Sequence, residues 1–427
     1  MSTLAIKPNK LKGTITLPPS KSLAHRAIIA ASLARGRSII KNIEYSKDIK
    51  ATIKAMKELG TMIFEYDDYL EIDGTTTYMK SNCEINCFES GSTLRFLIPV
   101  SLVYENNLHY TGEGRLGKRP LDVYYNIFDK QGIGYLYRED VVDLYIRGQL
   151  APDVFEIPGN VSSQFITGLL FALPLLNGDS IIKVTSPLES KAYIDLTLDI
   201  LDKFGIRIMN NQYQEFIVFG NQSYKACDYE VEGDFSQAAF YLCAGALGNS
   251  IAIKGMNLDS KQGDKSMIDT LKFMGCSLTE SEQGVSVYSG LLSSSIRIDG
   301  SQCPDIIPVI ALSCALSHGV SEIVNISRLR IKESDRLSAT VEMINLLGGI
   351  AIEQNDAMII QGVETLHGGK VSVYHDHRMA MLAAIASTVC ENAVVIDDKD
   401  CVNKSYPSFW DDFKMLGGEV DEFNMGD

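Results

Sequence analysis

The sequence predicts an α/β (α+β) protein of two similar domains, and three regularities of the chain support this fold class. Six segments with helical periodicity end at glycines spaced 72, 73, 70, 73 and 69 residues apart. Segments with the alternating pattern of a β-hairpin follow these glycines. Six other helices, apolar on nearly every side, lie between these segments. The six glycines are Gly60, Gly132, Gly205, Gly275, Gly348 and Gly417.

The glycine-ended helices are the first recurring element, because glycine suits the left-handed position that follows a helix. They are expected at 49–60, 123–132, 196–205, 267–275, 340–348 and 409–417. Hairpins are expected after the first five, at 61–74, 133–148, 206–220, 276–290 and 349–362.

The apolar helices are the second recurring element, and each leads through a turn into a strand. They are expected at 23–34, 93–103, 165–176, 236–246, 305–316 and 379–389. A helix that is apolar all round is buried, so these helices should lie inside a layered unit. The repeat is therefore βαβαββ, with three copies over 21–220 and three over 233–427, and one extra strand in 3–17. We expect each domain to arrange its three units around a pseudo-threefold axis, with the N-termini of the buried helices facing the interdomain cleft.

Composition limits the classes of function. A chain of 427 residues, 45% apolar and 22% charged, is expected to be a soluble globular protein. Its net charge of −15 disfavours a nucleic acid partner. A small anionic substrate is still compatible with this net charge, because salt screens global charge over about 8 Å.

Nine scattered cysteines fit a reducing cytoplasm. The most apolar run, 165–176, is too short to span a bilayer, and no signal-peptide pattern opens the chain. Neither Cys83 and Cys87 nor His375 and His377 completes a metal-binding set.

Polar residues gather at the starts of the apolar helices. In the stretch 18–26, Ser22 is expected to cap the helix, with Lys21 just outside the first turn and Arg26 one turn further on. A helix N-terminus favours an anion. An ordinary cap with solvated cations is the alternative for one such motif, but its recurrence favours an anion site. The other starts carry Gly91, Ser92 and Arg95; Ser162, Ser163 and Gln164; Asp234 and Ser236; Asp305; and His375, Asp376, His377 and Arg378.

Two further stretches carry charge. In 328–336, Lys332, Glu333 and Arg336 have the spacing to share a helical face, although a solvated, salt-bridged turn would explain them too. The stretch 112–120 matches G-x-G-x-x-G. It lacks the helix and the acidic residue of a dinucleotide site, so a phosphate-binding turn through Arg115 is the better interpretation.

Several motifs together resemble a known family. They include PSKS at 19–22, SGSTLR at 90–95, VSSQF at 161–165, LRIKESDR at 329–336 and DHRMAM at 376–381. In this order along the chain they resemble the 5-enolpyruvylshikimate-3-phosphate synthases. The resemblance implies two domains, one formed by 1–20 with 231–427 and the other by 21–230.

The resemblance also implies a site for two anionic substrates. Shikimate 3-phosphate would be bound by Lys21, Ser22, Arg26, Ser162, Ser163, Ser190, Tyr193, Asp305 and Lys332. Phosphoenolpyruvate would be surrounded by Lys21, Gly91, Arg95, Arg115, Gln164, Arg336, Arg378 and Lys404. Arg95 either contacts this substrate or supports the loop. Pro19, His25, Glu89, Phe96, Ala192 and Arg328 depart from the family's commoner pattern.

The reaction implied by the resemblance moves an enolpyruvyl group onto the 5-hydroxyl of shikimate 3-phosphate and releases phosphate through a tetrahedral intermediate. Asp305 is expected to be the general base, and Glu333 with Lys21 the proton shuttle at the enolpyruvyl carbon. No metal or organic cofactor is expected. We expect a cytoplasmic monomer in aromatic amino acid biosynthesis, with neither nucleic acid nor membrane as partner. Gly91 lacks a side chain that would obstruct glyphosate, so a sensitive enzyme is expected.

Three other functions compete with this hypothesis. The related UDP-N-acetylglucosamine enolpyruvyl transferase uses a cysteine loop, where this chain has Gly114, Arg115 and Leu116. A non-catalytic sensor of phosphorylated ligands on the same fold is a second alternative, and the intact Lys21, Asp305, Glu333 and Lys404 disfavour it. A nicotinamide-dependent dehydrogenase rests only on the glycines of 112–117.

Overall fold

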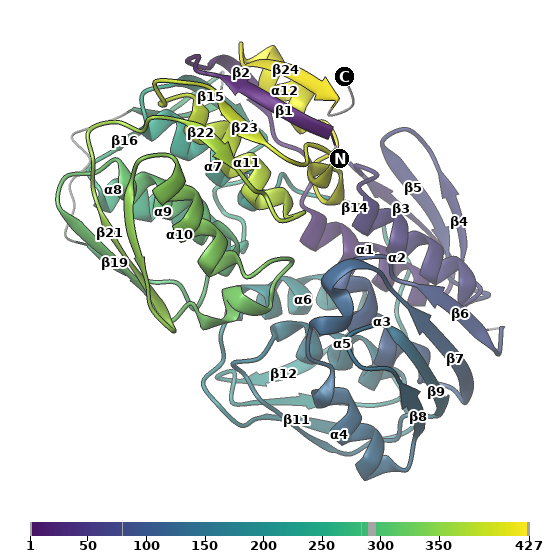
Figure 1. The fold of residues 1–427 in the computed structure, drawn as a ribbon. Helices are drawn as coiled ribbons and strands as arrows, with labels where there is room; N and C mark the ends of the chain where they lie inside the picture. Colours follow the sequence, from purple (N-terminus) through teal and green to yellow (C-terminus); the bar gives the residue numbers. More distant parts are fainter. Residues whose placement is uncertain (1, 79, 283, 289–295, 425–427) are drawn as a thin grey trace. The chain divides into compact units, whose positions relative to one another are not determined.

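The structure is a computed structural model that describes residues 2–78, 80–282, 284–288 and 296–424. It divides into two compact units (Figure 1). Unit 1 comprises Met1–Pro18 and Glu232–Asp427, and unit 2 comprises Pro19–Val231. The mixed α/β class predicted from the sequence is confirmed.

Unit 2 alternates buried and glycine-ended helices. Its helices are α1 (Lys21–Leu33), α2 (Lys47–Glu58), α3 (Gly91–Ser101), α4 (Asp122–Gln131), α5 (Ser163–Ala172) and α6 (Lys191–Lys203), with short 3₁₀ helices η1 (Gly114–Lys118) and η2 (Leu173–Leu175). Its strands are β3 (Arg37–Lys41), β4 (Met62–Glu65), β5 (Tyr69–Asp73), β6 (Cys83–Asn86), β7 (Asn106–Thr111), β8 (Gly134–Tyr137), β9 (Asp143–Gly148), β10 (Val154–Ile157), β11 (Ser180–Val184), β12 (Ile208–Asn211), β13 (Glu215–Val218) and β14 (Tyr229–Glu230).

Unit 1 repeats the same alternation. Its helices are α7 (Phe235–Ala246), α8 (Ser266–Phe273), α9 (Ile307–Ala315), α10 (Arg336–Leu346), α11 (His377–Ser387) and α12 (Phe409–Met415), with 3₁₀ helices η3 (Gly263–Lys265), η4 (Pro304–Ile306), η5 (Ser327–Ile331) and η6 (Asp400–Lys404). Its strands are β1 (Ser2–Lys7), β2 (Lys12–Thr16), β15 (Ser250–Lys254), β16 (Ser277–Ser281), β17 (Gly284–Tyr288), β18 (Arg297–Asp299), β19 (Val320–Val324), β20 (Ile350–Glu353), β21 (Ala357–Gln361), β22 (Gly369–Val371), β23 (Val394–Ile396) and β24 (Glu419–Asn424).

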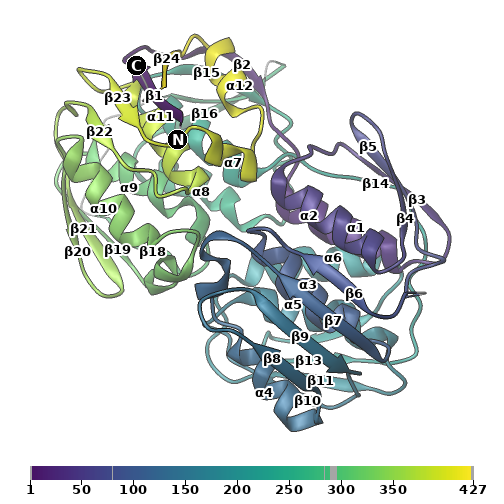
Figure 2. The same ribbon diagram turned by 45° about the vertical axis from the view of Figure 1, so that its right-hand side comes forward.

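The strands of the described residues form six four-stranded sheets with one shared pattern. In the sheet β6-β7-β9-β8, β6 and β7 are parallel and the other neighbours are antiparallel (Figure 2). A buried helix connects the parallel pair, and a glycine-ended helix leads into the hairpin. This is the βαβαββ repeat predicted above. Of the expected hairpin 276–290, residues 283, 289 and 290 lie outside the described residues.

The prediction of a single strand in 3–17 is wrong. The structure has two strands there, and they join different sheets of unit 1. β1 lies antiparallel to β23 and β24, and β2 lies parallel to β15. In its sheet, β1 lies between β23 and β24, the position that β9 has between β7 and β8.

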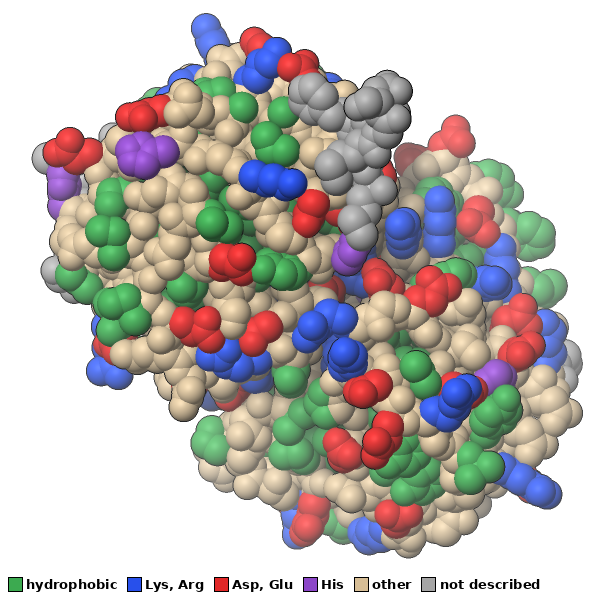
Figure 3. Space-filling model, viewed as in Figure 1, with side chains coloured by type: hydrophobic (Ala, Val, Ile, Leu, Met, Phe, Trp, Pro, Cys, Tyr) green, Lys and Arg blue, Asp and Glu red, His purple; other side chains and the backbone are tan. Residues whose placement is uncertain are grey.

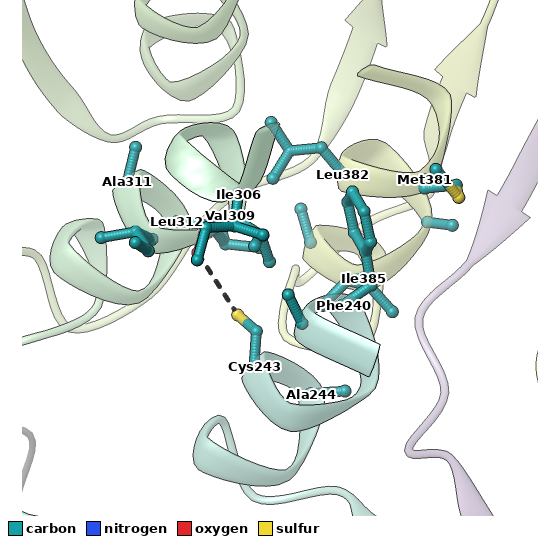
Figure 4. Close-up of a cluster of buried hydrophobic side chains, with 14 of the residues drawn as sticks. Phe240, Cys243, Ala244, Ile306, Val309, Ala311, Leu312, Met381, Leu382 and Ile385 are labelled. Atoms are coloured by element: carbon teal, nitrogen blue, oxygen red, sulfur yellow. Dashed lines mark hydrogen bonds between the residues drawn. The ribbon is translucent and has the colours of Figure 1, made fainter. Parts of the chain in front are cut away.

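The glycines predicted to end helices all have positive φ, between 68° at Gly132 and 105° at Gly60. The buried helices pack on one another inside each unit. In unit 1, side chains of α7, α9 and α11 meet in one apolar cluster that includes Phe240, Val309 and Leu382 (Figure 4). In unit 2, α3 and α5 approach closely at Gly168, where a Cβ would lie 2.4 Å from the Arg95 carbonyl oxygen. Burial of these apolar faces is the main stabilising term.

The face of the molecule seen in Figure 3 is mixed in charge. Acidic and basic side chains are interspersed over it. Among the helices of the described residues, none has both the length and the apolar character needed to cross a membrane.

Candidate active site

Lys21 is the first residue of α1, directly after the N-cap Ser20. The prediction that Ser22 caps this helix is wrong. The helix begins earlier, because the carbonyl of Ser20 already accepts from the amide of Ala24 at 2.8 Å. Ser22 thus lies in the first turn. Lys21 Nζ donates to Asp48 Oδ2 at 2.8 Å, and both side chains are largely buried. The ammonium group is therefore held at the start of α1 by a carboxylate from the start of α2.

Arg26 is a buried guanidinium one turn further along α1. Its Nε donates to Thr197 Oγ1 at 2.9 Å and its Nη2 to the Tyr193 carbonyl at 3.1 Å. Its Cζ lies 5.1 Å from the centre of the Phe96 ring. Burial lowers the pKa of Arg26 to about 10, so the group still carries its charge at neutral pH. A buried cation of this kind can bind an anion with little rearrangement.

The starts of α3 and α5 are joined by Arg95 and Gln164. Arg95 Nη1 donates to Gln164 Oε1 at 2.9 Å, and Gln164 Nε2 donates to Ser92 Oγ at 3.0 Å. Arg95 Nη2 donates to the Pro120 carbonyl at 2.9 Å, and its Cζ lies 4.9 Å from the Phe165 ring centre. These contacts favour the supporting role for Arg95. Ser162 caps α5 by accepting from the Gln164 amide at 3.3 Å.

Gly91 begins α3, and it lies against the side chain of Arg119. A Cβ at Gly91 would lie 2.4 Å from Arg119 Nη1 and 2.8 Å from its Cζ. A larger residue would have to displace this guanidinium. Arg115, four residues before Arg119, is exposed on η1. In the predicted phosphate-binding turn, Arg115 thus lies in η1 and Arg119 directly follows it.

The remaining predicted residues of unit 2 lie at the starts of α5 and α6. Ser163 is buried as the first residue of α5. Ser190 precedes α6 with φ 56°, a left-handed conformation that is rare outside glycine, asparagine and aspartate. Tyr193 lies in the first turn of α6, with its ring centre 5.9 Å from Arg26 Cζ. Arg26 therefore links α1 to α6.

Arg336 is the central residue of the charged cluster in unit 1, and its side chain is fully buried. It bonds Asp376 through Nε at 2.9 Å and through Nη2 at 3.1 Å. Nη2 also bonds Glu333 Oε2 at 2.8 Å, and Nη1 bonds Asp305 Oδ1 at 3.1 Å. Burial opposes the charge of Arg336, but Asp376, Glu333 and Asp305 outweigh it and raise its pKa.

Asp305 faces three cations. Lys332 Nζ lies 3.3 Å and Arg336 Nη1 3.1 Å from Oδ1, and Arg378 Nη2 lies 3.2 Å from Oδ2. Burial favours the neutral acid, but Arg378, Lys332 and Arg336 hold the pKa of Asp305 well below its usual range. Burial lowers the pKa of Lys332 to about 8, although the Asp305 carboxylate acts to raise it. The charges of Arg328 and Arg336 lower this pKa further.

The prediction that Lys332, Glu333 and Arg336 share one face of a helix is wrong, because α10 begins only at Arg336. Lys332 and Glu333 reach the cluster from the turn between η5 and α10. Arg378 is buried at the start of α11, whose cap Asp376 accepts from the Arg378 amide at 2.9 Å. Lys404 is buried at the end of η6, which packs against α11.

Three residues of these clusters were not assigned to the site from the sequence. Asp48 has the pattern of an ordinary acid in the first turn of a helix, which stabilises the helix dipole. Asp376 was recognised only as part of a polar helix start, and Arg119 only as part of a glycine-rich motif. Neither motif reveals that Asp376 anchors Arg336 or that Arg119 covers Gly91. Among the described residues, no group of three or more His, Cys, Asp or Glu side chains is arranged to hold a metal ion.

Comparisons with known proteins show the family of the chain. The family model EPSP synthase (3-phosphoshikimate 1-carboxyvinyltransferase) matches residues 6–413. The chain belongs to the EPSP synthase family. Its activity is that of a 3-phosphoshikimate 1-carboxyvinyltransferase, an enzyme of the shikimate pathway.

Two relatives named 3-phosphoshikimate 1-carboxyvinyltransferase are similar to this EPSP synthase over their whole length. The protein from Clostridium beijerinckii is 52% identical over 435 residues and covers 100% of both chains. That from Clostridium perfringens is 54% identical over 424 residues, 99% of this chain and 100% of its own.

Solved structures support the fold. EPSP synthase from Acinetobacter baumannii has a TM-score of 0.81 at 22% identity and covers 99% of this chain and 100% of its own. The enolpyruvyl transferase NikO from Streptomyces tendae has a TM-score of 0.80 at 15% identity. It covers 99% of this chain and 98% of its own. These likenesses confirm the predicted fold, and the family model with the two relatives confirms the predicted family.

Proposed function

We propose that this transferase moves the enolpyruvyl group of phosphoenolpyruvate onto the 5-hydroxyl of shikimate 3-phosphate, by addition and then elimination of phosphate. The observation that carries the proposal is the cluster of Lys332, Arg336 and Arg378 around Asp305. Such a cluster offers an ionised carboxylate for proton transfer beside cations that bind anionic groups.

Shikimate 3-phosphate is bound chiefly by unit 2. Lys21, Ser22 and Arg26 present a cation, a hydroxyl and a buried guanidinium along the first turns of α1. Ser162, Ser163, Ser190 and Tyr193 add hydroxyl groups at the starts of α5 and α6. Charge-assisted hydrogen bonds contribute about 1.5–3 kcal/mol each, so a few of them suffice to hold a phosphate. Asp305 and Lys332 of unit 1 are assigned to the same substrate.

The residues proposed to bind phosphoenolpyruvate are mostly cations. In unit 2 they are Lys21 and Arg115, together with the amide of Gln164 and the backbone of Gly91. In unit 1 they are Arg336, Arg378 and Lys404. Arg95 supports this group by fixing Gln164, as its 2.9 Å hydrogen bond indicates. Arg336, Arg378 and Lys404 are buried, and buried cations in fixed positions stabilise the charge that develops in the transition state without reorganising.

The chemical steps use the acids and amines of these clusters. Asp305 accepts the proton of the 5-hydroxyl as the oxygen attacks the enolpyruvyl carbon. Glu333 and Lys21 deliver a proton to the methylene carbon and then remove it, as phosphate leaves. Arg336 Nη2 donates to Glu333 Oε2 at 2.8 Å and so fixes the direction of this carboxylate, which supports the assignment. Neither a metal nor an organic cofactor takes part in this scheme.

A coupled phosphate-release assay tests the function. We expect phosphate release only when shikimate 3-phosphate and phosphoenolpyruvate are both present, with the enolpyruvyl ether as the second product. Release with UDP-N-acetylglucosamine as the acceptor would instead indicate the related transferase. Binding of both substrates without turnover would indicate a sensor.

Inhibition and assembly complete the proposal. Glyphosate inhibits competitively with phosphoenolpyruvate, because Gly91 has no side chain to obstruct it. Unchanged turnover at millimolar glyphosate would contradict this.

The enzyme works as a monomer in the cytoplasm. Its nine cysteines, all of them free thiols, support a reducing compartment. Light scattering of the purified protein measures its molar mass in solution and tests whether it is a monomer.

A further inference from the structure

Four buried polar side chains of unit 2 form a continuous hydrogen-bonded chain that the proposed chemical steps do not use. His25 Nδ1 lies 2.7 Å from Thr52 Oγ1, which lies 2.7 Å from Thr93 Oγ1. Thr93 Oγ1 in turn donates to Ser90 Oγ at 2.7 Å. The exposed fraction of each of these four residues is 0%. Polar side chains are costly to bury, so a chain of four of them calls for a reason.

The chain begins between two helices that carry residues of the proposed site. His25 lies on α1, four residues after Lys21, and Thr52 lies on α2, four residues after Asp48. Side chains four residues apart lie one above the other on a helix. The hydrogen bond of His25 with Thr52 thus joins α1 to α2 one turn beyond the 2.8 Å ion pair of Lys21. Since α2 also packs against α3, Thr52 can extend the chain to a third helix.

At its other end, the chain holds the start of α3. Ser90 is the N-cap of this helix, and its Oγ accepts from the Thr93 amide at 3.2 Å as well as from the Thr93 hydroxyl. Gly91, whose backbone is assigned to phosphoenolpyruvate, directly follows Ser90. A Cβ at Gly91 would lie 2.4 Å from Arg119 Nη1, so this backbone packs closely against the Arg119 guanidinium. The cap therefore sets where the Gly91 backbone lies.

The hydrogens of the chain can be placed because each hydroxyl group has only one. Thr93 uses its hydrogen on Ser90, so it must accept from Thr52. Thr52 then has no hydrogen left for the imidazole ring, so it must accept from His25 Nδ1. In either charge state, the His25 ring therefore carries a proton on Nδ1. All three hydrogen bonds point from α1 toward the cap of α3, and hydrogen bonds aligned in this way strengthen one another.

We propose that His25 and Thr52 are positioning residues for phosphoenolpyruvate. They act through Thr93: because Thr52 donates to its hydroxyl oxygen, the Thr93 hydroxyl hydrogen is left to bond Ser90. The cap before Gly91 is thereby tied to α1 and α2. This inference rests on the proposed function, in which the Gly91 backbone binds phosphoenolpyruvate.

Steady-state kinetics of full-length variants in the phosphate-release assay test the positioning role. Thr52→Val keeps the shape of the side chain but removes the hydroxyl group, which breaks the chain in the middle. We expect KM for phosphoenolpyruvate to rise about two- to tenfold, the effect of one neutral hydrogen bond. KM for shikimate 3-phosphate should stay equal to wild type, because the chain ends at α3 and not at α5 or α6. Thr52→Ser restores the hydroxyl group and should restore KM for phosphoenolpyruvate.

Two variants of His25 test the direction of the first hydrogen bond. In His25→Asn the side-chain amide takes the place of Nδ1 and can donate to Thr52, whereas in His25→Gln it takes the place of Nε2. KM for phosphoenolpyruvate should therefore rise in His25→Gln, as in Thr52→Val, and should rise less in His25→Asn. Equal KM values with a lowered Tm in both variants would indicate a structural role.

Nuclear magnetic resonance of the ¹⁵N-labelled histidine rings tests the position of the proton without any substrate. The protein has six histidines, and the ring signals missing from His25→Asn identify those of His25. We expect a proton on its Nδ1. An Nδ1 without a proton would overturn the chain, whatever the activity of the enzyme.

Thr61→Val is the matched control. Thr61 is buried in unit 2 shortly after α2, and its Oγ1 lies 3.0 Å from Thr77 Oγ1. The chemical change is the same as in Thr52→Val, but this hydrogen bond does not lead to the start of α3. We expect Thr61→Val to keep the wild-type KM for phosphoenolpyruvate, even if its Tm decreases.

Three kinetic results would overturn the inference while the proposed function stands. They are a folded Thr52→Val variant with wild-type KM, an equal rise of KM for both substrates, and the same rise in Thr61→Val. If Thr52→Val does not fold, a wild-type KM in His25→Gln overturns the inference equally. A wild type that releases no phosphate would overturn the proposed function and the positioning role with it, whereas the magnetic resonance experiment would still decide whether the chain exists.

Discussion

Replacing Arg336 by methionine tests whether the charged cluster of unit 1 is a single interdependent network. Arg336 is fully buried and bonds Asp376, Glu333 and Asp305 at 2.8–3.1 Å. Methionine fills much of the volume but leaves these carboxylates without their shared cation. Breaking a buried ion pair from one side costs about 3–5 kcal/mol, and we expect a loss of this size in the free energy of unfolding of unit 1.

The pH dependence follows from the carboxyl groups. Burial opposes ionisation, yet the cations hold the pKa of Asp305 and of Asp376 below their usual values. A lowered carboxyl pKa contributes stability that is present above the unfolded pKa of about 3.9 and is lost as pH falls through the folded value. Without Arg336, burial raises both pKa values. The deficit of the Arg336→Met variant should thus be largest at neutral pH and shrink toward pH 4.

The assay uses the single tryptophan of the chain. Trp410 lies on α12 in unit 1, and its Nε1 donates to the Lys399 carbonyl at 2.9 Å. Its fluorescence during urea unfolding therefore reports on unit 1. With an m-value of about 2 kcal/mol/M, the midpoint should fall by roughly 1.5–2.5 M.

Arg297→Met is the matched control. Arg297 pairs with Glu322 at 3.3 Å, but its side chain is 72% exposed. Exposed ion pairs contribute at most about 1 kcal/mol, so this variant should remain close to wild type. Equal losses for the two variants, or a loss below about 1 kcal/mol for Arg336→Met, would refute the network.

Three further substitutions test the proposed roles in catalysis and binding. Gly91→Ala places a Cβ 2.4 Å from Arg119 Nη1, so steady-state kinetics should show a raised KM for phosphoenolpyruvate and weaker glyphosate inhibition; unaltered inhibition would contradict the placement. Asp48→Asn removes the carboxylate 2.8 Å from Lys21 Nζ. A charged hydrogen bond of about 1.5–3 kcal/mol corresponds to a loss of about 10- to 150-fold in kcat/KM, and wild-type kcat/KM would argue against this anchor. Asp305→Asn should lower kcat by about 100- to 10,000-fold, as for the loss of a general base; single-turnover rates equal to wild type would exclude Asp305 from this role.

Much of the fold could be predicted from the sequence because it depends on local backbone preferences. Helices end where glycine adopts positive φ, as at Gly132 and Gly60, and that preference belongs to the residue itself. Burial of the second helix series follows from side chains that are apolar on every face. Short motifs such as LRIKESDR at 329–336 and DHRMAM at 376–381 indicated the family. The helix start shows the limit of local preferences. A serine at the start of an apolar run favours the cap position, but Ser22 lies in the first turn because α1 begins at Lys21.

The partners of the site residues depended on tertiary structure. Lys21 meets Asp48, 27 residues away, and Arg336 meets Asp376, 40 residues away. His25 meets Thr52 across 27 residues. Spacing along one helix cannot indicate such pairs, because packing between helices decides which side chains face each other. The sequence by itself determined the repeat, the family and the residue types of the site. Only the packed structure decided which carboxylate holds which cation, because burial and charge act between groups that are close in space rather than along the chain.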